Sequence, residues 1–328
     1  MTAREGELQG SKNIKCVTSR YTDSQVTEWL RCIGYTQPDV VPSLFSANAE
    51  NLYIRILMRL HMLRRAIHDM DVSPEGVFPR LIREKRGFGS VCFAQNCLML
   101  EMLRGLGYRV YPGAARVNRS DDSVPDFTSL QHQVLFVQPS PSGTETYVVD
   151  VGWGAAGLVR PILLSDSPSN VIPGACPPEE HRLTRRPHPS SSIEAPPTDW
   201  RLEMRCGTHQ PDWRVVFAFS KAGFYPAYFN VCMYLGAQRP AAGPLWGNPF
   251  IAEVLCVRHF LVDTEKGHIG RYVLARDRVK RQVGETSEVM RLLKTEYERA
   301  AALREIFGVE IYDEDVKYIR GRVAALVS

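Results

Sequence analysis

The side chains best suited to covalent chemistry in this sequence are a cysteine, a histidine and an aspartate at positions 92, 132 and 150. Cys92 comes directly after the glycine-containing turn RGFGSV and opens a stretch of helical period. A thiol at that place faces unpaired N–H groups and the positive end of the helix dipole, both of which favour the nucleophilic thiolate. A buried cysteine of the helix core is the competing interpretation.

His132 and Asp150 lie on two predicted strands that a short loop joins. His132 begins the apolar run HQVLFV, Asp150 ends the run ETYVVD, and the loop between them is PSPSG. A hairpin centred on Pro141 places residues 132 and 150 directly opposite one another, with Cβ atoms about 4.5–5.5 Å apart. The carboxylate then accepts the imidazole N–H and leaves the other ring nitrogen for a thiol. The alternatives are a structural strand histidine and an aspartate that serves a turn.

The elements that must position these residues show both helical and extended periods. Residues 92–106 carry apolar side chains every three to four positions, and Gly107 is a natural helix stop. We expect further helices at 26–33, 52–68 and 293–307, and strands at 108–117, 132–137, 144–151, 213–219, 254–263 and 270–275. Residues 161–200 are rich in proline and serine, which indicates a long surface connection or insertion. Helices, then antiparallel strands, then a mixed end predict an α+β fold.

The composition argues against several classes of protein. The chain has 328 residues, enough for two or three packed subdomains, and its 44% hydrophobic content is ordinary for a globular protein. A net charge of +4 without a basic, aromatic-rich stripe argues against a nucleic-acid partner. The polar beginning and the lack of a long apolar run predict a cytoplasmic protein without a membrane segment. The eight cysteines form no CxxC pair, so we expect reduced thiols and no metal site.

With their flanking motifs, the three residues resemble the arylamine N-acetyltransferase family. The nucleophile segment of that family runs approximately RGGxCxExN and leads into a helix that closes with LGF. The matching stretch here is RGFGSVCFAQNCLMLEMLRGLGYRV, which begins at Arg86, includes Asn96 and is followed by ARV at 115–117. The family's aspartate opens DVGFG, and DVGWG spans residues 150–154 here. The resemblance covers roughly residues 25–312 and is strongest over 80–155.

This resemblance implies a papain-like fold in three parts. An N-terminal helical bundle over residues 1–107 would carry the nucleophile. A central antiparallel β-barrel over 108–225 would hold the proline-rich insertion at 161–200, and a C-terminal α/β lid would span 226–328. The resemblance also implies a cytoplasmic enzyme of xenobiotic metabolism.

The implied reaction is a ping-pong acyl transfer by a triad of Cys92, His132 and Asp150. Cys92 takes the acyl group of acetyl-CoA, or of another acyl-CoA. His132, steered by Asp150, then manages the proton of the arylamine or arylhydrazine that attacks the thioester.

The resemblance also assigns binding roles around this triad. Thr128, Ser129 and Gly152 correspond to places of CoA contact, and Phe93 and Trp153 would face the aromatic acceptor. A turn role for Gly152 and a core role for Trp153 are the alternatives.

Departures from the family pattern leave the substrate preferences open. The nucleophile loop is two residues longer than in RGGxC, and Ala94 stands where the family often has an acidic residue. The loop LGAQRPAAGPLWGN replaces a Ser/Thr-rich cleft segment, so acetyl-, propionyl- and malonyl-CoA are all candidate donors. These features resemble divergent fungal members. Two other classes keep the same residues: a papain-like or transglutaminase-like hydrolase, and a binding protein without activity.

Overall fold

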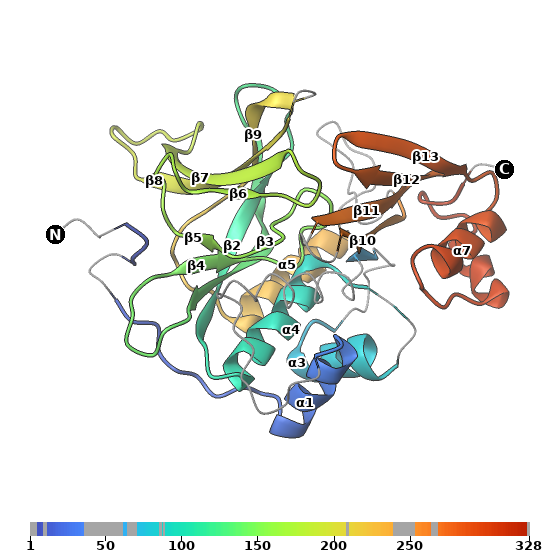
Figure 1. Cartoon of the computed structure of the whole chain (residues 1–328), viewed down its shortest axis with the longest axis horizontal. Coiled ribbons are helices and arrows are strands. Elements are labelled where there is room, and N and C mark those ends of the chain that lie inside the picture. The colour runs from blue at the N-terminus through green and yellow to red at the C-terminus, as the bar shows by residue number, and fades with distance from the viewer. Residues whose placement is uncertain are drawn as a thin grey trace.

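A computed structural model describes residues 5–8, 12–35, 62–63, 71–84, 87, 89–207, 210–238, 253–263 and 268–326. Figure 1 shows a large curved sheet, a smaller sheet beside it, and helices packed against both. The α+β class predicted from the sequence is confirmed. Within the described residues, no helix is long and apolar enough to cross a membrane.

The N-terminal helices begin and end at recognisable sequence signals. They are α1 (Asp23–Cys32), α3 (Pro74–Phe78), the π-helical turn η1 (Pro79–Arg83) and α4 (Cys92–Gly105). Thr22 and Gln25 form a capping box at the start of α1, and Ser73 caps α3. Gly107, just beyond α4, has a φ of +86°, a conformation that favours glycine. The helix predicted over 52–68 lies outside the described residues, apart from the short strand β1 (Met62–Leu63).

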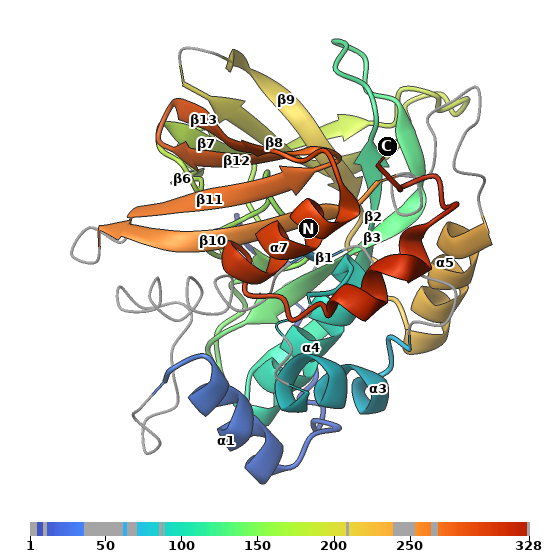
Figure 2. The same cartoon turned by 90° about the vertical axis from the view of Figure 1, so that its right-hand side faces the viewer.

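Helix α4 runs through the middle of the molecule, between the large sheet and the other N-terminal helices (Figures 1 and 2). Its apolar side chains are buried on nearly all faces: Phe93, Ala94, Leu98, Met99, Leu100, Met102 and Leu103. A helix that is apolar all round is one that protein encloses. The helix predicted over 92–106 is confirmed, and it ends one residue earlier.

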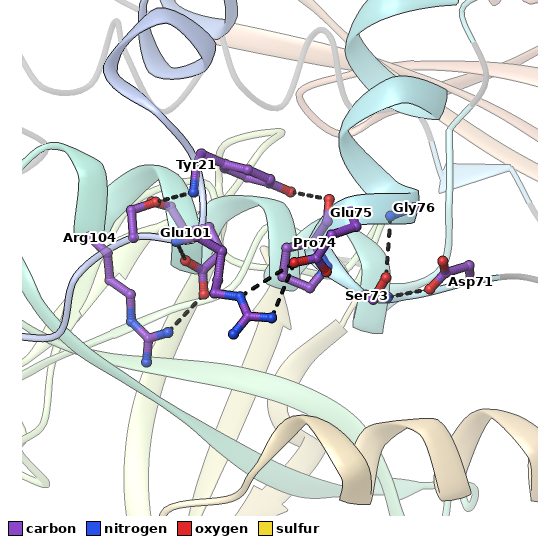
Figure 3. A network of polar contacts seen from close by, with 10 residues as sticks. Tyr21, Asp71, Ser73, Pro74, Glu75, Gly76, Glu101 and Arg104 are labelled. Carbon is purple, nitrogen blue, oxygen red and sulfur yellow. Dashed lines mark hydrogen bonds and ion pairs between the residues drawn. The ribbon is translucent and has the colours of Figure 1, made fainter.

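A polar network ties the C-terminal half of α4 to the N-terminal segment and to α3 (Figure 3). Glu101 is only 2% exposed; it accepts a hydrogen bond from the backbone N–H of Arg20 at 2.6 Å and pairs with Arg104 at 2.7 Å. The Tyr21 hydroxyl donates to the carbonyl of Pro74 at 2.9 Å. The network therefore fixes α4 at the end opposite to Cys92.

The larger sheet, within the described residues, has eight antiparallel strands that wrap into a nearly closed barrel (Figures 1 and 2). In spatial order they are β5 (Ile162–Leu163), β4 (Tyr147–Val149), β3 (Phe127–Gln138), β2 (Arg109–Asn118), β9 (Gln210–Phe219), β8 (Thr198–Cys206), β7 (Glu179–Pro187) and β6 (Val171–Pro173). Buried Val134, Phe136 and Phe217 are part of its apolar interior. The strands predicted at 108–117, 132–137, 144–151 and 213–219 all belong to this sheet.

The proline-rich segment 161–200 is not the surface connection that its composition predicts. It contributes β5, β6, β7 and the start of β8 to the barrel. In β7, Glu179, His181 and Leu183 are buried and alternate with more exposed neighbours. The alternation of a half-buried strand is present in EEHRLT, but polar side chains occupy two of the three buried positions. A reading by composition therefore points to a loop.

The smaller sheet has the strand order β1–β10–β11–β12–β13. Its members after β1 are β10 (Leu255–Asp263), β11 (His268–Ala275), β12 (Arg278–Val283) and β13 (Thr286–Leu292), which confirms the strands predicted at 254–263 and 270–275. Helix α7 (Glu296–Glu305), predicted within 293–307, packs its Leu303 against the sheet's Cys256 and Leu274.

The described residues also include the helix α5 (Pro226–Gln238) and the 3-10 turn η2 (Asp313–Ile319). Helices to Gly105, barrel strands to Phe219 and the later elements follow one another along the chain. The three-part division with boundaries after residues 107 and 225 stays a prediction.

Candidate active site

Cys92 is the first residue of α4, at the point where this helix meets β3. Val91, at the N-cap position, makes no side-chain hydrogen bond to the helix. Because Cys92 is the first helical residue, it lies at the positive end of the helix dipole, and no side chain at the N-cap competes with it for the free N–H groups. Cys92 is 6% exposed, and its thiol lies 3.8 Å from the carbonyl oxygen of Gln131 on β3.

His132 and Asp150 form a buried pair beside this sulfur. The Nε2 atom of His132 and the Oδ2 atom of Asp150 are 2.7 Å apart, and their side chains are 2% and 0% exposed. The ring also makes a hydrogen bond with the side chain of Cys92. Since Asp150 occupies Nε2, the Nδ1 atom faces the sulfur. The structure thus brings together the three residues that the sequence singles out.

The strand register that joins His132 to Asp150 differs from the predicted one. Leu135 pairs with Val149, so Asp150 lies one step beyond the last pair and next to residue 134, not directly opposite residue 132. A displacement of two residues keeps both side chains on one face, and the two groups meet as diagonal neighbours.

Side-chain contacts at the other end of the hairpin accompany this register. The Gln138 side-chain amide, at the end of β3, donates to the carbonyl of Thr144 at 3.2 Å and to the Thr146 hydroxyl at 3.2 Å. In the observed register residue 138 lies opposite residue 146, whereas a hairpin centred on Pro141 would place it opposite residue 144.

The charge on His132 follows from two opposing effects. Burial lowers its pKa, but the attraction of Asp150 and Cys92, together with their hydrogen bonds, raises the pKa overall, to about 10. The ring therefore holds a proton at neutral pH and presents a donor to the sulfur. A cationic imidazole beside a thiol is the arrangement that stabilises a nucleophilic thiolate.

Asn96 holds the carboxylate that orients the ring. Its Nδ2 atom donates to the Gln133 carbonyl at 2.7 Å and to Oδ1 of Asp150 at 2.9 Å, while its Oδ1 accepts the backbone N–H of Val151 at 3.1 Å. Sequence reasoning treats Asn96 only as a motif residue. Its place four residues after Cys92, on the same helix face, is the signal that could have assigned it a structural role in the site.

Gly152 makes a close approach to helix α4 at Cys92. A Cβ atom at this position would lie 2.6 Å from Cα of Cys92 and 2.8 Å from Nδ2 of Asn96. Its backbone N–H donates to Oδ1 of Asp150 at 2.8 Å. A packing reason for this glycine is therefore present without any ligand, and its contact with CoA stays a prediction.

The two aromatic residues predicted to face the acceptor have different surroundings. The Trp153 ring meets the His132 ring edge-on, with centroids 4.9 Å apart at 86°, and lies 5.2 Å from Phe217. Phe93 is 4% exposed and packs on Phe229 of α5 at 5.5 Å. Trp153 thus borders the candidate triad, whereas Phe93 belongs to the apolar core, and the acceptor contacts of both stay predictions.

Thr128 and Ser129 serve the strand that carries His132. The Thr128 hydroxyl accepts the backbone N–H of Val117 at 3.0 Å and donates to the carbonyl of Ser129 at 2.7 Å. The exposed Ser129 hydroxyl accepts from the Gln131 amide at 3.1 Å. Their CoA contacts stay predictions. No group of residues suited to hold a metal ion occurs in the described part of the chain.

Known proteins share both the sequence pattern and the fold. A family model described as N-acetyltransferase matches residues 59–214. An N-malonyltransferase, FDB2 of Fusarium pseudograminearum, is 27% identical over 75% of this chain and 72% of its own length. The arylamine N-acetyltransferase of Mycolicibacterium smegmatis is 34% identical over 35% of this chain and 39% of its own. The solved structure of the Mycobacterium marinum arylamine N-acetyltransferase in complex with CoA has a TM-score of 0.67 at 21% identity and covers 87% of this chain and 92% of that one.

These likenesses settle the class of the protein. The curved antiparallel barrel, the buried helix that carries Cys92 and the matched family model are those of an acyltransferase with a papain-like fold. The chain is similar to the arylamine N-acetyltransferases and to a fungal N-malonyltransferase, which supports a divergent, fungal-type member of that family.

Proposed function

We propose that this acyltransferase moves an acyl group from an acyl-CoA to an aromatic amine or hydrazine through a thioester on Cys92. The observation that carries the proposal is the place of the Cys92 sulfur, at the N-terminus of α4 and hydrogen-bonded to a buried histidine that Asp150 orients. The CoA complex of the Mycobacterium marinum relative supports an acyl-CoA as donor.

In the first half-reaction, the Cys92 sulfur attacks the carbonyl carbon of the acyl-CoA thioester. The bond between that carbon and the CoA sulfur breaks, and CoA leaves with a proton from the His132 imidazolium. Backbone N–H groups near the start of α4 are suited to stabilise the negative charge that develops on the carbonyl oxygen. One thioester replaces another, so the step is nearly isoenergetic, which suits a cysteine better than a serine.

In the second half-reaction, the nitrogen of the amine or hydrazine attacks the acyl carbon on Cys92. An amide bond forms, the carbon–sulfur bond breaks, and the neutral His132 takes the proton that the nitrogen loses. Asp150 stabilises the imidazolium that results, and Asn96 keeps the carboxylate in place through the 2.9 Å hydrogen bond described above.

The identity of the acyl group is a further part of the proposal. The Fusarium relative is named an N-malonyltransferase, which supports malonyl-CoA as a donor beside acetyl- and propionyl-CoA. We therefore propose testing each of these three CoA esters separately, in the absence of an acceptor.

Intact-mass measurement after incubation with each CoA ester tests the proposal directly. We expect an increment of one acyl group with at least one donor, located on Cys92 by peptide mapping and removed when an arylamine is added. Cys92→Ser and His132→Ala should abolish transfer and keep the fold. Cys97→Ser, on the same helix, should form the acyl-enzyme as the wild type does.

Two outcomes would contradict this function. Turnover of a peptide or amide without CoA, with no acyl increment from any donor, would favour the papain-like or transglutaminase-like hydrolase. An unmodified Cys92 that also fails to react selectively with iodoacetamide at neutral pH would favour a binding protein without activity.

A further inference from the structure

We propose that Arg271, on β11 of the smaller sheet, is a positioning residue for the candidate active site. Together with Glu179 it holds the main chain of the turn at residues 152–157, and through this turn it sets Trp153 against His132. The inference rests on the proposed function, in which His132 serves Cys92.

Arg271 is a buried cation with all of its donors engaged. It is 6% exposed; its Nη2 atom pairs with the Glu179 carboxylate at 2.9 Å, and Nε and Nη2 donate to the Gln282 side-chain carbonyl at 3.1 and 2.9 Å. Its Nη1 atom donates to the carbonyl of Ala155 and, at 3.4 Å, to Glu179. The five N–H groups of a guanidinium thus bind one carboxylate, one amide and one main-chain carbonyl.

The carbonyls of two consecutive residues in the turn are fixed by these buried groups. Arg271 binds the carbonyl of Ala155, and Nε2 of His181 donates to the carbonyl of Ala156 at 3.1 Å. His181 is fully buried on β7, and burial lowers its pKa, so the ring is neutral and donates through Nε2. Glu179 lies two residues before His181 on the same face of this strand. One buried polar cluster, formed by Arg271 of the smaller sheet and by Glu179 and His181 of the larger sheet, therefore holds the main chain of this turn.

The position of the Ala155 carbonyl also fixes the position of Trp153, because the turn between residues 153 and 157 is tightly closed. The N–H of Gly157 donates to the carbonyl of Gly154 at 3.2 Å, and Gly154 has a φ of +101°, which favours glycine. A Cβ atom on Gly157 would lie 2.8 Å from Cβ of Trp153. A shift of the carbonyl of Ala155 therefore moves the backbone that carries the indole.

The indole of Trp153 packs beside the candidate triad, against the ring of His132. It meets the His132 ring edge-on, and Phe217 contacts both rings, at 5.1 Å from His132 and 5.2 Å from Trp153. Asp150 fixes one ring nitrogen, but the orientation of the ring plane toward the sulfur also depends on these aromatic contacts. Displacements of about 1 Å in such an arrangement can cost a rate factor of about 100.

The test compares Arg271→Met with Arg278→Met. Arg278, on the neighbouring strand β12, is half-exposed and pairs only with the adjacent Asp277 among the described residues, so it is a matched control. We expect Arg271→Met to slow iodoacetamide alkylation of Cys92, followed by peptide mapping, by about 10-fold or more, and to lower kcat similarly with little change in KM for the acyl-CoA. Arg278→Met should leave both quantities at wild-type values.

A second variant separates positioning from mere stability, because removing one member of a buried pair can prevent folding. In Arg271→Met combined with Glu179→Leu, both charges are absent and the fold should tolerate the change, but the carbonyl of Ala155 still lacks its donor. We expect this double variant to fold and yet to react slowly at Cys92. Wild-type alkylation and kcat in the folded double variant would overturn the proposal. A wild-type protein that forms no acyl-enzyme at Cys92 with any of the CoA esters would instead refute the proposed function.

Discussion

Gly152→Ala tests whether the close packing between the turn after Asp150 and helix α4 governs the reactivity of Cys92. The added methyl group would lie 2.6 Å from Cα of Cys92, closer than real Cβ contacts, and 3.0 Å from its Cβ. The Cα atom belongs to the main chain of α4, which is enclosed on nearly all faces and cannot recede. The turn and the start of the helix must therefore separate, which moves the sulfur relative to His132.

The magnitude follows from the cost of overpacking a closed interior. Inserting one methyl group where the surroundings cannot yield typically costs about 1–3 kcal/mol of stability. Gly107→Ala is the matched control, because it introduces a side chain at a φ of +86° with nothing within 4 Å of the new Cβ atom. Its backbone strain alone should cost about 1–2 kcal/mol. The two variants should thus lose similar stability for different reasons.

Urea denaturation and the rate of Cys92 alkylation by iodoacetamide together separate these reasons. We expect both variants to unfold at lower urea concentration than the wild type, whereas only Gly152→Ala alkylates Cys92 more slowly. A Gly152→Ala protein with wild-type stability and a wild-type alkylation rate would show that the turn and α4 do not pack as described.

Three further predictions concern the groups around the site. Asn96→Leu removes the donor to the Gln133 carbonyl and to Asp150 and leaves the Val151 N–H without its acceptor. We expect the free energy of unfolding in urea to fall by about 2–4 kcal/mol and acyl transfer to become slower. An unchanged kcat would contradict the role of Asn96 in the site. The pKa of His132 is raised from 6.5 to about 10, so the stability that the charged ring contributes is fully present below about pH 6.5 and is lost as the pH rises through about 10. The difference in unfolding free energy between wild type and His132→Gln should therefore narrow between these two pH values. A difference that stays constant with pH would refute the charged ring. Glu101→Ala breaks an ion pair with Arg104 whose side chains are 3% and 15% exposed, and it should lower the free energy of unfolding by about 3 kcal/mol. Glu75→Ala breaks an ion pair with Arg20 whose side chains are 61% and 66% exposed, and it should lower that free energy by less than about 1 kcal/mol. Equal losses would show that the buried network does not anchor α4.

The meeting of His132 and Asp150 is predictable from the sequence, although the register is not. Two strands and a short loop limit the side chains to one face or the other, and the predicted parity is correct. The shift of two residues is accompanied by contacts of the Gln138 amide with Thr144 and Thr146, which no local sequence pattern predicts. Local periodicity therefore predicts which face a side chain occupies, and tertiary contacts decide how far along the strand it lies.

The segment 161–200 shows a different reason for a wrong prediction. Proline and serine are frequent in it, but β7 buries Glu179 and His181 by pairing them with groups from distant parts of the chain. Arg271, the partner of Glu179, is 92 residues away, and it contacts Ala155 across 116 residues. Sequence reasoning treats buried polar residues as exposed because their partners cannot be seen from local spacing.

The enclosed position of α4 has a consequence for how such an enzyme can diversify. A nucleophile carried on a surface loop changes its location whenever that loop gains or loses residues. Here the sulfur belongs to a helix that is buried in the interior, so we expect length changes in outlying segments to leave its position unchanged. New substrate preferences can then arise through the elements that approach the sulfur from outside, while a volume change at a remote interior residue such as Leu103 would disturb the chemistry itself.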